Sequence, residues 1–204
     1  MVDVLVPYGC GMTSVAGSRK GRVKREEALR VALEVFAEQG YRRTSLRTVA
    51  DRAGLSLAGL MHYFDSKESM LTEILRARDE DSRRRFAGGG DRLDYLLATI
   101  EHNSGEPGLV ALYLSLGAAA VDEKHPAHEF FVGRLRRVRA EIVEYARSRG
   151  RAPRAPLTEE AAAQLTLAMI DGIQVQWLAD SSIDMAQRIR EGIDVLYTVD
   201  RGVQ

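Results

Sequence analysis

Residues 53–67 read AGLSLAGLMHYFDSK, and this stretch interrupts an otherwise helical pattern. Gly54 breaks the preceding helix, Ser56 follows two residues later, and a short apolar run ends at Tyr63 and Phe64. A glycine turn between two helices, with a serine capping the second, is typical of a helix-turn-helix. The second helix can be short, because a DNA major groove is about 12 Å wide and accepts one helix. The stretch therefore favours a DNA-reading head over an ordinary corner of a helical bundle.

The segments on either side complete a three-helix head. A first helix is predicted from about Val23 to Gln39, where Gly40 follows as a C-terminal cap. Thr44 or Ser45 begins a second helix that ends at Gly54. After the short third helix, residues 66–68 open a longer one that reaches about residue 86, before the glycines at 88–90. The head is expected to span residues 22–67, after a flexible segment over residues 1–21.

The rest of the chain, residues 68–204, also shows helical periodicity and no sustained alternation. The further helical candidates cover residues 91–103, 106–122, 126–149, 158–179 and 183–199, with a proline-containing linker at 149–157. The predicted fold class is therefore all-α, with about nine helices: the N-terminal head and a C-terminal helical domain for ligand binding and dimerisation.

Composition and charge narrow the functional classes. The chain has 204 residues, 45% hydrophobic and 28% charged, which is ordinary for a globular protein. Its single cysteine, Cys10, excludes an intrachain disulfide. No apolar run approaches the roughly 20 residues that cross a bilayer, and the first residues lack a basic leader, so we expect a cytoplasmic protein with no membrane partner. Residues 19–67 hold 11 Lys and Arg against 6 Asp and Glu, although the net charge of the chain is zero. The excess of positive charge in residues 19–67 predicts a polyanionic partner.

Residues 44–71, TSLRTVADRAGLSLAGLMHYFDSKESML, resemble the DNA-binding signature of the TetR family of bacterial transcriptional repressors. The matching positions are Thr44, Ala50, Ala53, Gly54, Ser56, Leu60, Tyr63, Phe64, Ser66, Lys67 and Leu71, with Val49 and Leu55 as conservative replacements. The resemblance implies a homodimeric repressor that binds a palindromic double-stranded DNA operator and is released by a small molecule. It implies no cofactor, no metal and no catalytic residue.

The recognition helix departs from the signature at three positions. Leu57, Ala58 and Met61 replace the usual basic residue, glycine and tyrosine. Such an apolar surface can contact thymine methyl groups but cannot pair with guanine as arginine does. The predicted DNA-binding residues are Arg22, Lys24, Arg43, Thr44, Ser45, Ser56, Leu57, Ala58, Gly59, Met61, His62, Tyr63 and Lys67. Leu60 and Phe64 are expected to face inward and pack the head.

Two apolar stripes predict a dimer interface in the last two helices. One contains Leu165, Met169, Gly172 and Ile173, and the other Met185, Ile189, Ile193 and Leu196. Packing of both stripes within one chain is the alternative. A mostly apolar effector site is predicted at Leu96, Ile100, Tyr113, Leu116, Leu135, Ile142, Tyr145, Gln174 and Trp177, although residues at such spacing are more often core than pocket.

Two other classes of function remain open at this point. An enzyme is not indicated, because the chain has no glycine-rich phosphate loop or nucleophile elbow, and its only candidate metal pair is His125 with His128. A helical small-molecule-binding protein with a degenerate head is the other alternative, since Leu57 replaces a cation. Salt-dependent binding to duplex DNA separates this alternative from a DNA-binding regulator.

Overall fold

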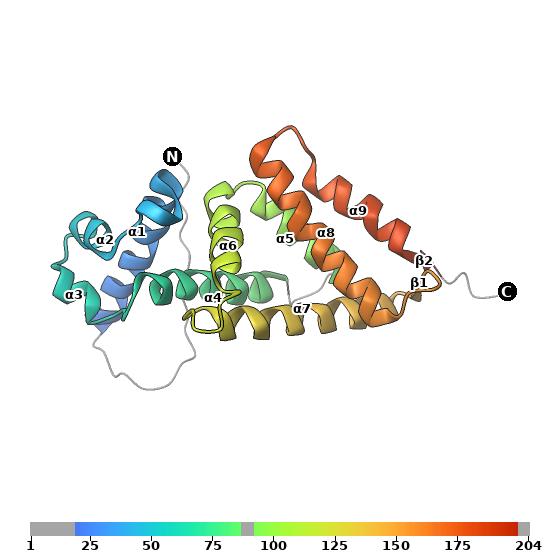
Figure 1. Ribbon diagram of the computed structural model, residues 1–204, viewed down its shortest axis with the longest axis horizontal. Helices are drawn as coiled ribbons and strands as arrows, with labels where there is room; N and C mark the ends of the chain where they lie inside the picture. Colours follow the sequence, from blue (N-terminus) through green and yellow to red (C-terminus); the bar gives the residue numbers. More distant parts are fainter. Residues whose placement is uncertain (1–18, 87–91, 200–204) are drawn as a thin grey trace. The chain divides into compact units, whose positions relative to one another are not determined.

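The computed structural model describes residues 19–86 and 92–199, except for the side chains of 83–86, 92–97 and 199. The chain divides between residues 88 and 89 into two compact units. The first unit contains α1 (Arg19–Arg43), α2 (Leu46–Arg52), α3 (Leu57–Met61) and α4 (Lys67–Phe86) (Figure 1). It therefore includes the long helix α4 in addition to the predicted head.

The core of the first unit lies between α1, α2, α3 and α4. Fully buried side chains from all four helices meet there, among them Leu29, Val35, Val49, Leu60 and Met70. Gly40, at φ 73° and ψ 170°, interrupts α1, so the regular helix ends where the sequence predicts a cap. The beginning of this helix differs from the prediction. Residues 19–21 are helical and form the start of α1, whereas the sequence predicts a flexible segment over residues 1–21.

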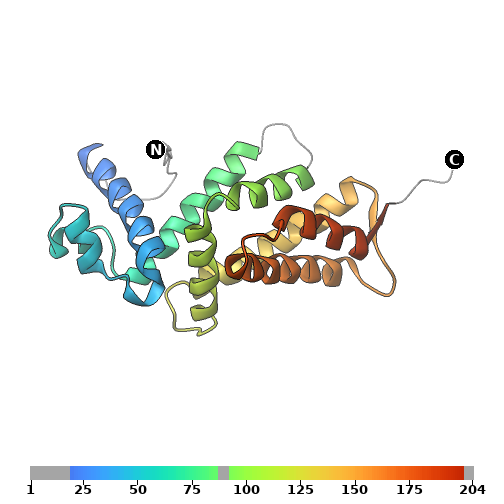
Figure 2. The same ribbon diagram turned by 90° about the horizontal axis from the view of Figure 1, so that it is seen from above.

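The second unit contains five helices and two short strands within the described residues. The elements are α5 (Arg92–Asn103), α6 (Pro107–Ala119), α7 (His128–Ser148), β1 (Arg151–Pro153), α8 (Glu159–Ala179), α9 (Met185–Leu196) and β2 (Tyr197–Val199). In both views α8 and α9 run side by side, and α7 also packs against α8 (Figures 1 and 2). With the first unit, the described residues hold nine helices and only two three-residue strands, which confirms the all-α fold class.

The strand pair corrects the expectation that the last helix continues to residue 199. Backbone dihedrals become extended at Tyr197, and residues 197–199 pair antiparallel with residues 151–153 of the predicted linker. The two strands are too short to produce a recognisable alternation in sequence. They join the start of α8 to the end of α9.

The buried face of α8 forms the centre of the second unit. Ala163, Leu167, Ile170 and Trp177 lie on this face and belong to one cluster with residues of α5, α6, α7 and α9. Two polar residues share this face: Thr166, 1% exposed, whose hydroxyl donates to the backbone oxygen of Ala162, and Gln174, 6% exposed. None of the described helices is long and apolar enough to span a bilayer.

Candidate functional site

Local side-chain bonds hold the short helix α3 in place. The hydroxyl oxygen of Ser56 accepts a hydrogen bond from the backbone N–H of Gly59 at 3.0 Å, which caps the helix. Ser45 caps α2 in the same way through the N–H of Thr48, at 3.1 Å. Gly54 joins the two helices with φ 64°, a conformation that L side chains resist. These three features confirm the helix-turn-helix predicted from sequence.

The two faces of α3 have different surroundings. Leu60 and Phe64 are 0% and 1% exposed, so they pack the head as predicted. Ala58, Met61 and His62 are exposed on the outer side, and half of the Met61 surface is accessible. The predicted contacts Leu57, Gly59 and Tyr63 are half-buried, and Ser56 is exposed. The outward side of α3 therefore carries small and apolar side chains together with the polar His62.

Two predicted DNA contacts are used inside the head. The hydroxyl of Thr44 is buried and donates to the backbone oxygen of Gly40 at 2.9 Å. The ammonium group of Lys67 donates to the backbone oxygen of Tyr41. Neither group points freely toward a partner in this conformation, because each closes the turn between α1 and α2. Ser45 is half-buried and its hydroxyl forms the cap of α2.

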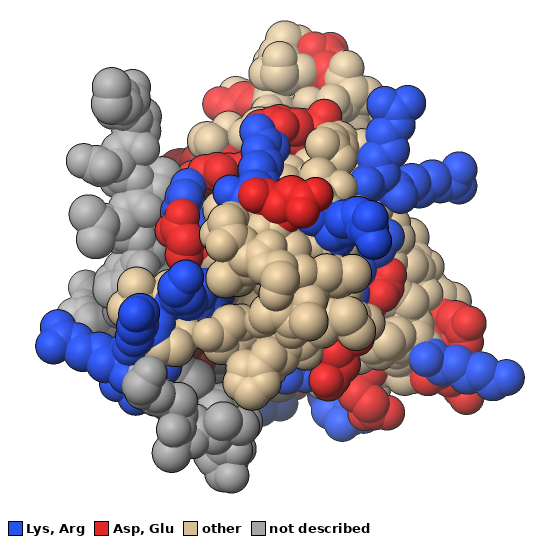
Figure 3. Space-filling model, turned by 90° about the vertical axis from the view of Figure 1, so that its left-hand side faces the viewer, with Lys and Arg blue, Asp and Glu red and all other residues tan. Residues whose placement is uncertain are grey.

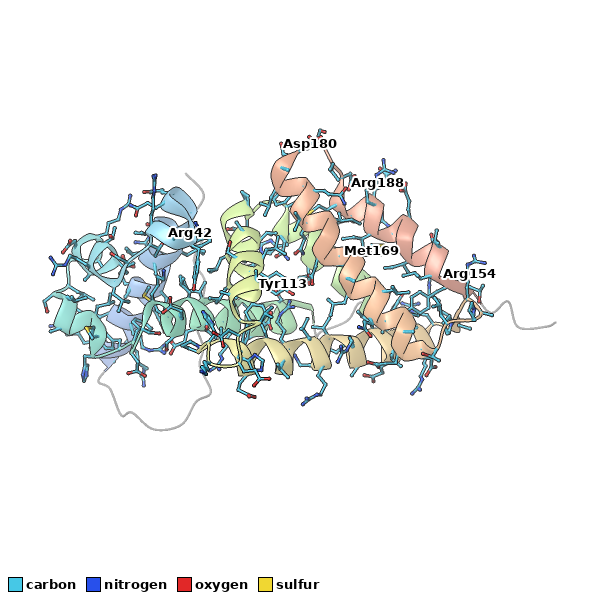
Figure 4. The ribbon with its side chains drawn as sticks, viewed as in Figure 1. Arg42, Tyr113, Arg154, Met169, Asp180 and Arg188 are labelled. Atoms are coloured by element: carbon cyan, nitrogen blue, oxygen red, sulfur yellow. The ribbon has the colours of Figure 1, made fainter. Side chains whose placement is uncertain are left out.

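Unpaired cations surround α2 and α3. Arg22 and Lys24 on α1, Arg42 and Arg43 at its end, and Arg47 on α2 are all exposed. None of these five forms an ion pair with another described residue, whereas Arg52 is held by Glu38. Figure 3 is viewed from the side on which Figure 1 draws α2 and α3. Uncharged residues fill the middle of this view, with Lys and Arg side chains and acidic groups around them. Arg42 is labelled in Figure 4.

Arg25 takes a role that the sequence does not indicate. Its guanidinium group pairs with Glu73 of α4 and lies 5.2 Å from the centre of the Phe64 ring. Burial raises the pKa of Glu73, and the charge of Arg25 opposes this rise. Arg25 thus connects α1 to α4, next to Phe64. In sequence, Arg25 is one of several cations in the run 19–25. The sequence therefore does not show that Arg25, and not a neighbouring cation, forms an internal ion pair.

The predicted effector residues fall into two groups in the second unit. Ile100, Leu116, Ile142, Tyr145, Gln174 and Trp177 are buried, and Tyr113 and Leu135 are half-buried. The side chain of Leu96 lies outside the described residues. Ile100, Ile142, Tyr145 and Trp177 belong to one apolar cluster, as core residues do, and Leu135 packs against it. Gln174 differs from the others, because its side-chain oxygen is buried without a hydrogen-bond partner.

A polar cluster that the sequence did not indicate consists of Tyr113 on α6, Arg134 on α7 and Asp171 on α8. Arg134 donates to the Tyr113 hydroxyl at 3.2 Å, and its guanidinium carbon lies 4.6 Å from the centre of that ring. Burial raises the pKa of Asp171, while the charge of Arg134 and a hydrogen bond with Tyr113 act in the opposite direction. Arg134 thus joins α7 to α6. Figure 4 labels Tyr113.

The predicted dimer residues also separate by burial. Met185, Ile189 and Ile193 are at most 3% exposed and face the core of their own chain, with Leu196, Met169 and Ile173 packed against that core. The stripe on α9 is therefore covered within the chain, as the alternative reading of the sequence allows, and does not offer a dimer surface. Leu165 and Gly172 on α8 are exposed. The apolar stripe alone could not reveal which neighbour covers it.

His125 and His128 bind backbone groups at the start of α7. The ring of His125 accepts from the N–H of Ala127 at 3.1 Å, and His128 lies 2.9 Å from the oxygen of Ala120. No group of three metal-ligating side chains occurs among the described residues. His128 thus connects the start of α7 to the end of α6, whereas the bond between His125 and its sequence neighbour Ala127 stays within the turn between them.

These features define a helix-turn-helix DNA-binding domain: a short capped helix, the buried Leu60 and Phe64 beneath it, and exposed cations on the same head. Residues 28–74 match the model of the bacterial regulatory proteins of the tetR family. The chain therefore carries a DNA-binding domain of the TetR family. The family and its relatives below are transcriptional regulators and not enzymes.

One relative with a similar head is the transcriptional repressor KstR2 of Rhodococcus jostii. It is 50% identical over 58 residues, which is 28% of this chain and 28% of the relative. The aligned part thus spans less than a third of that protein.

Two solved structures share the fold over both units. A transcriptional regulator from a Rhodococcus species has a TM-score of 0.64 at 24% identity, covering 84% of this chain and 92% of that one. The repressor FadR of Thermus thermophilus, in complex with lauroyl-CoA, has a TM-score of 0.55 at 20% identity with the same coverage.

Proposed function

We propose that the chain is a ligand-responsive transcriptional repressor that binds a palindromic DNA operator as a homodimer. One observation carries this proposal: α3 is capped and anchored by Leu60 and Phe64, and its other side is exposed on a head whose exposed Arg42, Arg43 and Arg47 form no ion pair with a described residue. A helix held in this way can enter a major groove while flanking cations bind phosphate. Repression is supported by the similarity of the head to that of KstR2, which is a transcriptional repressor. Such a protein acts in the cytoplasm, where the operator lies.

Selection from a randomised duplex library, at two salt concentrations, tests the proposal. An enriched palindrome whose affinity falls steeply with salt is the expected result, because each phosphate contact releases bound counterions. Absence of enrichment would overturn it. Ala58 and Met61 further predict that thymine methyl groups contribute to recognition. Replacing single thymines of the operator by uracil should weaken binding at one or more positions.

The second unit is proposed to bind the effector. FadR, which shares the fold, is seen in complex with lauroyl-CoA. In this chain, five helices contribute to a largely apolar cluster, and the buried side-chain oxygen of Gln174 on α8 has no hydrogen-bond partner among the described residues. The effector would release DNA by binding more tightly to a conformation whose two heads no longer match the operator half-sites.

The proposed dimer contact lies on α8. Leu165, Val175 and Leu178 are 45%, 54% and 38% exposed, and Ala168 and Gly172 lie exposed between them. Positions 165, 168, 172 and 175 share one face of a helix, and the two small residues allow a second helix to come close. A Cβ atom added at Gly172 would meet nothing within 4 Å, so the space above it is open. The proposed dimer interface therefore lies on this exposed face of α8 and not on the apolar stripe of α9.

One observation favours a second function, a small-molecule-binding protein whose head does not read DNA. The segment from Ser56 to Tyr63 contains no Lys or Arg, although such helices commonly use a cation for bases or phosphate. The same library selection separates the two functions, since weak binding without a salt dependence would support this alternative.

A further inference from the structure

Gln174 is a polar residue in an apolar part of the second unit. It lies near the middle of the buried face of α8, four residues after Ile170 and three before Trp177, so these two apolar side chains are its neighbours on the helix. Only 6% of its surface is exposed. Its side-chain oxygen is buried and has no hydrogen-bond partner among the described residues.

A buried oxygen without a donor destabilises the free protein. Nearly all buried polar groups in folded proteins have a hydrogen-bond partner, because removing such a group from water without compensation is costly. A leucine or methionine at this position would avoid that cost, as the surrounding residues do. The oxygen is therefore explained if a donor reaches it from a molecule outside the chain.

The neighbouring polar groups are already used by one another. Asp171, one turn before Gln174, has Arg134 and Tyr113 as partners, and Arg134 also donates to Tyr113. The carboxylate and the guanidinium compensate each other, so they leave no net charge for a charged ligand. Among the described residues of α8, the Gln174 oxygen is a buried acceptor without a donor.

We propose that the effector is a neutral molecule with an apolar body and a hydroxyl or N–H group that donates to the side-chain oxygen of Gln174. This inference rests on the proposed effector-binding role of the second unit and narrows its ligand class. The effector is therefore a mostly apolar molecule that also requires a hydrogen-bond donor. The apolar neighbours Ile170 and Trp177 would contact its body, and Gln174 would select its polar group.

Matched series of small molecules test the inference on the full chain. One series contains 2-tetralol, its methyl ether and tetralin, and a second contains 1-octanol, its methyl ether and octane. In each series only the alcohol can donate a hydrogen bond, while the ether keeps an acceptor of similar size. Calorimetric titration or ligand-observed NMR should show that at least one alcohol binds about tenfold or more tightly than its ether and hydrocarbon.

Two variants on the same helix complete the experiment. Gln174→Met removes the acceptor with little change in volume, and it should abolish the preference for the alcohol. Gln176→Met, at an exposed position of α8, should keep that preference. The melting temperature of Gln174→Met should equal or exceed that of the wild type, because the variant has no unpaired buried oxygen; a lower value would show that Gln174 is bonded within the free chain and would overturn the inference.

The remaining outcomes are equally decisive. Equal binding of alcohol and ether, a preference that survives in Gln174→Met, or failure of every compound in both series to bind overturns the inference. Operator selection with the same preparation separates this failure from failure of the proposed function. If the protein binds an operator but prefers no alcohol, the proposed donor site at Gln174 is wrong and the proposed DNA-binding function is kept. If it prefers an alcohol but binds no DNA, the donor site is kept and the DNA-binding function is wrong.

Discussion

The ammonium group of Lys67 lies 3.1 Å from the backbone oxygen of Tyr41 and 4.4 Å from the centre of the Tyr41 ring. The first residue of α4 is thereby attached to the last residues of α1, after the interruption at Gly40. Lys67 also lies 3.7 Å from a carboxylate oxygen of Glu68. The lysine that the sequence assigns to the DNA backbone therefore holds the head together in this conformation.

Replacing Lys67 should lower the stability of the first unit. Lys67→Met removes a charged hydrogen bond and a contact with an aromatic face, which together contribute about 1–2 kcal/mol at a partly exposed site. Thermal or urea denaturation measures the change. Lys124→Met is the control, because Lys124 is exposed in the turn after α6. Equal stability of the Lys67 variant and the wild type would contradict a structural role for this lysine.

Arg43 and Arg52 should affect DNA binding differently. Arg43 is exposed and forms no ion pair with a described residue, whereas both terminal nitrogens of Arg52 bond Glu38, at 2.6 and 2.7 Å. If Arg43 contacts phosphate, Arg43→Gln should reduce the slope of log affinity against log salt by about 0.9. Arg52→Gln should leave the slope unchanged. The measurement is a salt titration of binding to the selected operator, and an unchanged slope for Arg43→Gln would remove it from the phosphate contacts.

Tyr41 should remain protonated well above pH 10. Burial raises its pKa to about 12, with further contributions from the charge and hydrogen bond of Glu68. A phenol whose folded pKa exceeds its unfolded value of 10 contributes stability that is present below pH 10 and is lost as the pH rises toward 12. The wild type should therefore lose stability more steeply than Tyr41→Phe between pH 10 and 12.

Ultraviolet absorbance gives an independent check of the Tyr41 titration. At pH 11 the folded wild type and folded Tyr41→Phe should show the same phenolate absorbance at about 295 nm, because Tyr41 is still protonated. One additional ionised tyrosine in the wild type at this pH would contradict the raised pKa.

Gly54 and Gly133 should respond to alanine with opposite signs. A Cβ atom added at either position would meet nothing within 4 Å, so crowding does not distinguish them. Gly54 has φ 64°, where an alanine costs about 1–2 kcal/mol. Gly133 lies inside helix α7, where alanine stabilises by about 0.5–1 kcal/mol. Denaturation should therefore show a lower free energy of unfolding for Gly54→Ala and a higher one for Gly133→Ala. A change in the same direction for both variants would contradict the requirement for a positive φ at Gly54.

Local chemistry explains which parts of the fold were predictable from sequence. Ser45, Ser56 and Thr158 each cap the helix expected after them, because a cap depends only on residues two or three positions away. Leu60 and Phe64 were also placed correctly, since helical spacing puts them opposite the exposed side of α3.

Contacts between distant parts of the chain were not predictable in this way. Lys67 meets Tyr41 across 26 positions and Arg25 meets Glu73 across 48. The stripe on α9 shows the same limit, because its spacing reveals an apolar face without indicating that the same chain covers it. The polar contacts of Asp171 likewise involve α6 and α7, whose relative positions no short segment encodes.

The exposed face of α8 gives a direct test of dimerisation. Val175 is 54% exposed beside the open space above Gly172, so Val175→Glu would place a charge in the proposed interface while leaving the core of the chain intact. Analytical ultracentrifugation should show a dimer for the wild type and a shift toward monomer for Val175→Glu. The control is Val121→Glu, at a residue 79% exposed in the turn between α6 and α7. A dimer that survives Val175→Glu, or that dissociates equally with Val121→Glu, would place the interface elsewhere. Because two half-sites bind with measurable affinity only when both heads are joined, Val175→Glu should also weaken operator binding without changing the fold of either unit.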